Sequence, residues 1–344
     1  MPVRVAINGF GRIGRNTLKA AWGRLKGFEV VAVNDLTDTK TLAHLLKYDT
    51  VYGQWGHRIG SDPRNLIIDG KKIPVFAVRN PAELPWGKMK VDVVLECTGI
   101  FRDREKAGLH LQAGAKLVVI SAPGKGKGIP TSVLGVNVDA KRDNFGKARI
   151  INNASCTTNC IAPVAKVIDR KFGVRSAFMT TIHGYTADQN LQDGPHKDLR
   201  RARAAAVNIV PTTTGAAVAT GEAIPSLQGK FDGLAIRVPV PVVSLADLTF
   251  VLKRKTDLET VRRVLREAAA GDLKGIMSVT EEPLVSSDFV GHDSSSVVDL
   301  DLTMLMHGNL LKVIAWYDNE WGYSMRLAEM AVRFAKSQLK KRIA

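Results

Sequence analysis

The sequence predicts an α/β protein whose two halves are built differently. In the first half, short apolar runs alternate with helical patterns, which is typical of βαβ units and a largely parallel sheet. In the second half, longer strand-like runs follow one another with few helices between them, which predicts an α+β region with a mixed or antiparallel sheet. The chain has 344 residues, and at roughly 100–200 residues per domain this length favours two domains or three.

Each half shows its elements in order along the chain. In the first half, the predicted strands are Val3–Asn8, Glu29–Asn34, Val91–Thr98 and Lys116–Ser121, and the predicted helices are Arg12–Leu25 and Asp103–Ala113. In the second half, the predicted strands are Ala177–His183, Gly233–Pro239, Asp247–Lys253 and Leu310–Tyr317, and the predicted helices are Asp257–Ala270 and Tyr323–Leu339. The boundary is expected near Asn152–Ser155, where no flexible linker separates the halves.

Composition places the chain among globular proteins without a membrane span. Hydrophobic residues make up 45% and charged residues 24% of the sequence, whereas a disordered chain is poor in apolar residues and rich in charge. No apolar run approaches the ~18 residues of a transmembrane helix, and the N-terminal residues lack a signal-peptide pattern. Three cysteines are too few for a disulfide scaffold, so we expect a reducing compartment and a cytoplasmic location.

The net charge is +16, and the excess lies in the first half. Residues 1–150 contain 25 basic and 13 acidic side chains, and residues 151–344 contain 24 and 20. Such a positive field favours anionic partners, which are phosphorylated metabolites, nucleotides or nucleic acid. A solvated surface that aids solubility is the commoner role of such lysines, so charge alone selects none of these partners.

A phosphate-binding turn follows the first predicted strand. The run from Gly9 to Gly14 fits the G-x-G-x-x-G pattern and opens a helical segment. Gly9 permits the tight turn, Gly11 lets backbone N–H groups approach a pyrophosphate, and Gly14 lets the helix pack close to the strand. The sequence therefore predicts a Rossmann-type dinucleotide-binding domain.

An acidic residue stands where the adenosine ribose of a dinucleotide should bind. Asp35 ends the second predicted strand, 21 residues after Gly14, a spacing at which a carboxylate accepts hydrogen bonds from the ribose. Its negative charge would repel a 2′-phosphate, so NAD is favoured over NADP. The alternative for Asp35 alone is a strand-end turn residue.

A cysteine lies at a predicted helix start. Ser, Thr and Asn side chains surround Cys156 just before the apolar stretch Ile161–Phe172, and such side chains cap helix N-termini. There the helix dipole and free N–H groups lower the pKa of a thiol, so Cys156 is a candidate nucleophile. Pro163 within this pattern is expected to remove a hydrogen bond or bend the helix.

His183 ends a predicted strand and is the candidate partner of Cys156. Near a low-pKa thiol, an imidazole acts as general base and thiolate partner. A strand-end histidine satisfied by backbone groups is the alternative. Cys160 and Cys97 are interpreted as packing residues, because no further Cys or His lies close enough in sequence to complete a metal site.

Candidate anion-binding side chains follow in three segments of the second half. Arginines and a hydroxyl-rich glycine turn suit phosphate binding. For Arg200 and Arg203 taken singly, a solvated basic segment is an equally good explanation. The segments are His196–Arg203, Pro211–Gly215 and the strand residue Arg237.

Taken together, six segments carry a family resemblance. The sequence closely resembles the phosphorylating glyceraldehyde-3-phosphate dehydrogenases, in the order of that family and over essentially the whole chain. Gly184 stands where the family usually has another small residue. The matching segments are Asn8–Arg15, Ile120–Pro123, Ala154–Cys160, His196–Ala205, Pro211–Ala217 and Trp316–Glu320.

The resemblance implies domains and an activity. Residues 1–154 would form the NAD-binding domain, residues 155–320 the catalytic and phosphate-binding domain, and the last helix, about 321–344, would pack back on the first domain. The activity would be NAD-dependent oxidative phosphorylation of D-glyceraldehyde 3-phosphate by inorganic phosphate to 1,3-bisphosphoglycerate, without a metal. The protein would be a homotetramer, with the segment from Gly184 to Ala206 near a neighbouring subunit's cofactor.

The resemblance also implies a role for each candidate residue. Cys156 would be the nucleophile that forms a hemithioacetal and then a thioester, and His183 would be its base. Residues holding the dinucleotide would be Gly9, Gly11, Arg12, Ile13, Gly14, Asp35, Arg79, Ser121 and Asn319, the last on the nicotinamide carboxamide. The attacking phosphate would bind Ser155, Thr157, Thr214 and Gly215, and the substrate's phosphate would bind at or beside Thr186, Arg201 and Arg237.

Three other functions are open on the sequence. An erythrose-4-phosphate dehydrogenase would use the same motifs on a longer sugar. A non-catalytic basic protein that binds RNA or DNA would fit the charge, although no recognised nucleic-acid module is present. For an enzyme, the charge and the tail Lys340-Lys341-Arg342 leave nucleic-acid binding open as a secondary role. A non-phosphorylating dehydrogenase is disfavoured by the hydroxyl-rich turn Thr212–Gly215.

Overall fold

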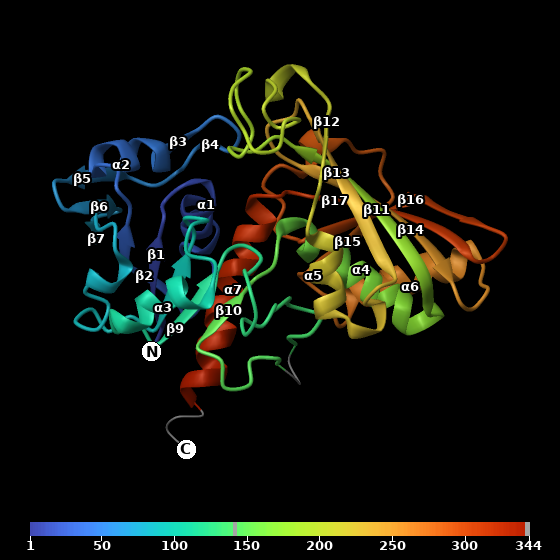
Figure 1. Cartoon of the computed structure of the whole chain (residues 1–344), viewed down its shortest axis with the longest axis horizontal. Helices are drawn as coiled ribbons and strands as arrows, with labels where there is room; N and C mark the ends of the chain where they lie inside the picture. The colour runs from blue at the N-terminus through green and yellow to red at the C-terminus, as the bar shows by residue number, and fades with distance from the viewer. Residues whose placement is uncertain (140–142, 341–344) are drawn as a thin grey trace. The chain divides into compact units, whose positions relative to one another are not determined.

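The computed structural model describes residues 1–139 and 143–340, which form two compact units (Figure 1). Unit 1 contains Met1–Ser132, Asp143–Ala154 and the chain from Ser324 onward, and unit 2 contains residues 133–139 and Ser155–Tyr323. Lys341 and Arg342 of the basic tail lie outside the described residues.

Unit 1 is built on an eight-stranded sheet with the order β10-β9-β8-β1-β2-β7-β6-β5. The strands from β10 to β7 are parallel, and β6 and β5 continue the sheet as antiparallel strands at one edge. The predicted strands and helices of this half are all present, with ends shifted by a few residues. The elements are β1 (Val3–Asn8), α1 (Arg12–Ala21), β2 (Phe28–Asn34), α2 (Thr39–Lys47), β3 (Tyr48–Asp49), β4 (Gly53–Gln54), β5 (Ile59–Asp62), β6 (Asn65–Ile68), β7 (Lys71–Phe76), β8 (Val93–Glu96), α3 (Arg104–Gln112), β9 (Leu117–Ile120) and β10 (Ile150–Asn152).

Helix α2, strands β3 to β7 and strand β10 were not predicted from the sequence. α2 begins after Asp38, whose carboxylate accepts a hydrogen bond from the Thr41 N–H at 2.9 Å. Its nine residues bury only Leu42, Ala43 and Leu46, and so short an apolar pattern does not by itself distinguish a helix from a strand. The strands that follow are two to six residues long, and their pairing rather than their composition defines them.

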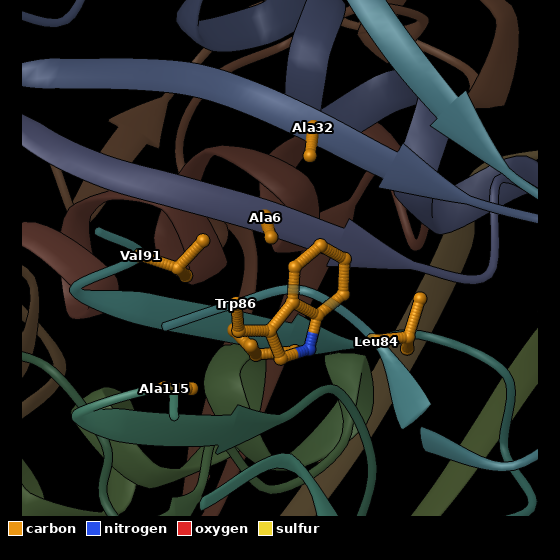
Figure 2. Close-up of a cluster of buried hydrophobic side chains, with 7 residues drawn as sticks. Ala6, Ala32, Leu84, Trp86, Val91 and Ala115 are labelled. Atoms are coloured by element: carbon orange, nitrogen blue, oxygen red, sulfur yellow. The ribbon is translucent and has the colours of Figure 1, made fainter. Parts of the chain in front are cut away.

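A buried tryptophan fills one face of the unit 1 sheet. Figure 2 shows the Trp86 indole beside Ala6 of β1 and Ala32 of β2, with Val91, Leu84 and Ala115 around it. The small alanine side chains leave room for the indole ring against the strands. Its Nε1–H donates to His110 Nδ1 at 3.1 Å, so the polar atom is also satisfied.

Unit 2 is built on a seven-stranded mixed sheet with the order β12-β13-β11-β14-β17-β16-β15. The pairs β11–β13 and β15–β16 are parallel, and the other neighbours are antiparallel, as predicted. The elements are α4 (Cys156–Phe172), β11 (Val174–Gly184), β12 (Val210–Thr212), α5 (Ala216–Ala223), β13 (Phe231–Val238), β14 (Ser244–Leu252), α6 (Leu258–Ala270), β15 (Met277–Thr280), β16 (Ser296–Met306), β17 (Leu310–Tyr317) and α7 (Trp321–Lys340). Of these, β12, α5, β15 and β16 were not predicted.

The helices α4 and α6 cover one face of this sheet, and α4 contacts β11, β14, β16 and β17. Burial alternates strictly along β14 from Ser244 to Leu252, which is the pattern of a strand with one covered face. Helix α4 continues through the buried Pro163. Pro163 has no N–H to donate, as expected, and the helix nevertheless continues because packing on the sheet stabilises it.

The last helix divides between the units. Trp321–Tyr323 belong to unit 2, and α7 from Ser324 onward belongs to unit 1. Within unit 1, the Phe334 ring packs on the Phe145 ring at 4.8 Å, and the Ser337 hydroxyl donates to Asp143 at 2.7 Å. None of the helices in the described ranges has the length and apolar character that crossing a membrane would need.

Candidate active site

A cavity of about 410 Å³ opens in unit 1 at the carboxyl ends of β1, β2 and β8. In open α/β sheets this edge is where ligands bind. Four of the predicted cofactor residues, Gly9, Gly11, Asp35 and Arg79, line the cavity. The rest of the lining consists of Asn8, Asn34, Leu36, Val78, Cys97, Thr98, Ile100 and Phe101.

The three glycines of the turn are required for different reasons. Gly9 has φ +89°, and a Cβ there would lie 2.7 Å from the Thr98 backbone nitrogen. A Cβ on Gly14 would lie 2.3 Å from the Gly9 carbonyl oxygen. At Gly11, by contrast, no protein atom lies within 4 Å of a Cβ. The fold itself needs Gly9 and Gly14, whereas the space before Gly11 fits the close approach of a pyrophosphate.

The Asp35 carboxylate is held at the edge of this cavity by the turn itself. One oxygen accepts the Phe10 N–H at 2.7 Å, and the other accepts the Thr37 N–H at 3.0 Å. These bonds fix the carboxylate where the ribose of a dinucleotide would lie, so the residues present fit such a cofactor.

The other predicted cofactor residues are placed differently. The Arg12 guanidinium pairs with Asp49 at 2.6 Å, so its side chain is directed to that carboxylate. Ser121 follows β9, and its N–H donates to the Glu96 carbonyl at 3.0 Å. Asn319 belongs to unit 2. Arg12, Ile13, Gly14 and Ser121 do not line the cavity.

Replacing Asp35 with alanine is expected to narrow the preference for NAD over NADP by roughly tenfold. The reason is that the variant loses the charge that repels a 2′-phosphate. The ratio of kcat/KM for the two cofactors measures the effect. Asp38→Ala is the matched control, because Asp38 caps α2 nearby without lining the cavity. A wild type that used NADP at least as well as NAD would contradict the assignment.

In unit 2, α4 and β11 bring Cys156 and His183 together. α4 starts at Cys156, and the Ser155 hydroxyl caps it by accepting the Thr158 N–H at 3.0 Å. His183 lies near the end of β11, and the Cys156 Sγ is 3.5 Å from the His183 Nε2. The chain separates the two residues by 27 positions, and the fold makes them neighbours.

The hydrogen bonds of His183 define its tautomer. The Nδ1 atom lies 2.6 Å from the Gly184 carbonyl oxygen. Arg237 Nη1, which can only donate, lies farther from Nδ1, at 3.1 Å, and also donates to the Gly184 carbonyl. Because the carbonyl oxygen only accepts and makes the shorter contact, we assign the proton to Nδ1. The neutral ring then presents the Nε2 lone pair to the thiol, which is the arrangement of a base facing its acid.

The expectation that the Cys156 thiol has a lowered pKa is wrong for this environment. Burial raises the pKa of Cys156, while the positive charge of Arg237 and hydrogen bonds from Thr157 and the Cys156 N–H oppose the rise. Burial, followed by the Arg237 charge, also lowers the pKa of His183 to about 3. Both pKa shifts favour the uncharged thiol and the uncharged imidazole, and transfer of the thiol proton to the nearby Nε2 would form the thiolate.

Tyr317 is a site residue to which the sequence analysis assigned no role. Its hydroxyl lies 2.9 Å from Thr157 Oγ1 and 2.7 Å from Thr181 Oγ1. Its ring packs edge-on against His183 at 6.0 Å, and burial raises its pKa. The signal was present, because Tyr317 lies in the Trp316–Glu320 segment.

Basic and hydroxyl side chains surround the Cys156–His183 pair. Arg237 donates to the Gly184 carbonyl at 3.1 Å and to Thr186 Oγ1 at 3.3 Å. Arg201 donates to Thr212 Oγ1 at 2.9 Å and also bonds Asp188.

The glycine turn of this region leads into a helix. Thr214 Oγ1 accepts the Ala216 N–H at 3.2 Å. Ala216 is the first residue of α5, and Gly215 is its N-cap residue. Thr157 lies in the first turn of α4, and Ser155 caps that helix. Hydroxyls and helix N-termini of this kind bind oxyanions. Within the described parts of the chain, no three His, Cys, Asp or Glu side chains gather as a metal would require.

Replacing Arg237 with glutamine is expected to move the alkylation of Cys156 by iodoacetamide to higher pH. The guanidinium is the main charge that holds the thiol pKa down, and the thiolate is the reactive form. The rate of alkylation against pH measures the shift. Arg203→Gln is the control, because the exposed Arg203 pairs with Asp193. Superimposable curves for wild type and Arg237→Gln would contradict the prediction.

Comparisons with known proteins match both halves of the chain. The model of the glyceraldehyde 3-phosphate dehydrogenase NAD binding domain matches residues 3–104, and that of the C-terminal domain matches residues 155–319. Glyceraldehyde-3-phosphate dehydrogenase 2 of Streptomyces avermitilis is 53% identical over 339 residues, which is 98% of this chain and 100% of that protein. Glyceraldehyde-3-phosphate dehydrogenase 1 of Bacillus subtilis and the glyceraldehyde-3-phosphate dehydrogenase of Geobacillus stearothermophilus are also each 53% identical over 339 residues, which is 98% of this chain and 100% of each relative.

Proposed function

The chain belongs to the glyceraldehyde-3-phosphate dehydrogenase family, and from that premise we propose that Cys156 and His183 carry out the reaction in this protein. The resemblance, the fold class and NAD as cofactor are confirmed. The protein is an NAD-dependent dehydrogenase that oxidises glyceraldehyde 3-phosphate and transfers the acyl group to inorganic phosphate. The observation that supports the residue roles is the 3.5 Å approach of Sγ to Nε2 at the start of α4.

The first half of the reaction forms a bond to sulfur. The thiol proton moves to His183 Nε2, and Sγ attacks the aldehyde carbon, so that the carbonyl electron pair moves to oxygen. The Cys156 backbone N–H stabilises that oxygen, and the protonated imidazole gives its Nε2 proton to it, which leaves a hemithioacetal and a neutral imidazole. His183 then takes the hydroxyl proton when the carbon is oxidised to a thioester. Bound NAD supplies the acceptor for the hydride that this oxidation releases.

The second half transfers the acyl group. A phosphate oxygen attacks the thioester carbon, the C–S bond breaks, and the sulfur leaves as a thiolate that regains its proton from the protonated His183. We assign this phosphate to Ser155, Thr157, Thr214 and Gly215. We assign the phosphate of the substrate to Thr186, Arg201 and Arg237. Two anion sites account for the number of hydroxyls and guanidinium groups around one thiol.

We further propose that residues 1–154 with α7 act as the cofactor domain and residues 155–320 as the catalytic domain. Asp35 would bind the ribose, and the turn Gly9–Gly14 would bind the pyrophosphate. Arg79, which lines the cavity, and Ser121 would complete the dinucleotide site. Asn319 would bind the nicotinamide carboxamide.

The deciding experiment follows NAD reduction with glyceraldehyde 3-phosphate, with and without inorganic phosphate. Multiple turnovers are expected only when phosphate is present, because phosphate releases the acyl group from Cys156. Equal turnover without phosphate would show a thioester-hydrolysing enzyme instead. Higher kcat/KM for erythrose 4-phosphate than for glyceraldehyde 3-phosphate would assign the protein to the longer sugar.

We propose a homotetramer. Large apolar side chains are exposed on the unit 2 sheet and on the loop before β12, although monomeric soluble proteins rarely expose many such side chains together. The Phe178 side chain, for example, is 68% exposed on β11. The others include Leu191, Leu199, Val207, Ile209, Leu234, Leu302, Met304 and Met306.

Light scattering after size-exclusion chromatography is expected to give the mass of four chains. Phe178→Glu is expected to produce smaller species, because a charge would be buried in the contact. A monomeric mass for the wild type at micromolar concentration would contradict the proposal.

We also propose a cytoplasmic location, where a reducing environment keeps the three free cysteines reduced. The oxidation state of these cysteines in freshly lysed cells tests the proposal.

A further inference from the structure

Ser244 connects the strand of the catalytic histidine to Asn319. Its hydroxyl oxygen accepts the Gly184 N–H at 3.2 Å and lies 2.9 Å from Asn319 Oδ1. Both side chains are buried, with 2% of Ser244 and 4% of Asn319 exposed. Gly184 also accepts the His183 Nδ1–H on its carbonyl. A single residue, Gly184, therefore lies between the base and the amide.

The direction of these bonds fixes the orientation of the amide. The Gly184 N–H can only donate, so the Ser244 oxygen accepts there and keeps its own proton. That proton is donated to Asn319, and only the oxygen end of the amide can accept it. The Nδ2 group of Asn319 is thereby left to donate to another partner.

We infer that Ser244 is a positioning residue that holds the Asn319 amide with its NH₂ group directed to an acceptor, the carboxamide oxygen of the nicotinamide. The inference rests on the proposed role of Asn319. Ser244 acts through its hydroxyl. Without that hydrogen bond, the Asn319 amide would be free to rotate and would present its oxygen and its NH₂ group in turn. An Asn319 NH₂ group held in place binds the oxygen of the nicotinamide carboxamide rather than its NH₂ group, and so sets the orientation of that carboxamide.

The experiment measures binding by calorimetry with two ligands, NAD and ADP-ribose, which lacks the nicotinamide. In Ser244→Ala, the dissociation constant of NAD is expected to rise about tenfold, since one oriented hydrogen bond is lost. The dissociation constant of ADP-ribose is expected to stay within about twofold of the wild-type value. A role confined to folding would change both ligands alike or neither.

Matched variants separate the possible outcomes. Thr303→Val removes another buried hydroxyl of the same sheet, which bonds the Asp299 carbonyl at 2.8 Å, and should change neither constant. If Ser244→Ala does not fold, Ser244→Cys keeps the volume with a weaker donor and is expected to show a smaller rise for NAD alone.

Asn319→Ala distinguishes failure of the inference from failure of the proposed function. If Asn319→Ala weakens NAD alone and Ser244→Ala does not, Asn319 keeps its role and the inference about Ser244 is overturned. If Asn319→Ala leaves NAD binding unchanged, the role of Asn319 fails and the inference fails with it. In an Asn319→Ala background, Ser244→Ala is expected to add no further change in NAD binding, because the two residues act through one contact. An additive effect in the double variant would overturn the inference.

Discussion

Replacing Cys156 with serine is expected to reduce dehydrogenase turnover by roughly 10⁴- to 10⁶-fold, the scale seen when an enzyme loses its nucleophile. A serine hydroxyl at this position would sit at the same helix start and opposite the same imidazole. It remains protonated at neutral pH, and the ester it would form transfers its acyl group less readily than a thioester. Turnover with glyceraldehyde 3-phosphate, NAD and phosphate measures the loss, and circular dichroism checks the fold.

The other two cysteines provide the control. Burial raises the pKa of Cys160 and of Cys97 to about 12 in each case, so neither thiol is reactive at neutral pH. Cys160 lies one helical turn beyond Cys156, and its sulfur is 3.7 Å from the Ser296 hydroxyl. Cys160→Ser should keep most activity and the single alkylation site. Equal losses in Cys156→Ser and Cys160→Ser, with both variants folded, would remove Cys156 from the role of nucleophile.

Replacing His183 with asparagine is expected to lower kcat by about 10²- to 10⁴-fold, the usual contribution of a general base. The thiol would lose the imidazole that faces its sulfur, with Nε2 at 3.5 Å. Since burial raises the pKa of Cys156, the thiol of the variant would ionise only by losing its proton to water at higher pH. Affinity for NAD should change little, because the cavity of the first unit remains intact.

Two measurements separate this role from a purely structural one. The rate of iodoacetamide reaction against pH is expected to fall at neutral pH in His183→Asn and to move to higher pH. A histidine that only satisfies backbone groups would lower the melting temperature and leave the alkylation curve in place. Superimposable curves would therefore exclude His183 as the proton acceptor for Cys156.

Local signals in the sequence were enough to predict the elements that carry chemistry. The strand Val3–Asn8, the glycines after it and Asp35 lie close together in sequence, so their spacing alone indicates the turn, the helix and the ribose carboxylate. The cap residues around Cys156 likewise predicted the start of α4, because capping depends on neighbouring backbone groups. The short strands β3 to β7 and the helix α5 escaped prediction, since α5 is mostly buried and lacks an amphipathic pattern.

The charge states and the partners of the site were decided by the tertiary structure alone. The sequence indicated a thiol activated by a helix start, but it could not weigh that effect against the burial produced by residues far along the chain. Packing places Arg237 beside His183, 54 positions apart, and Ser244 beside Asn319, 75 positions apart. A pKa depends on every group around an atom, and a hydrogen bond depends on which atoms the fold leaves within 3 Å or so. Sequence spacing determined which residues were candidates, and the three-dimensional packing determined that the His183 imidazole faces the Cys156 thiol.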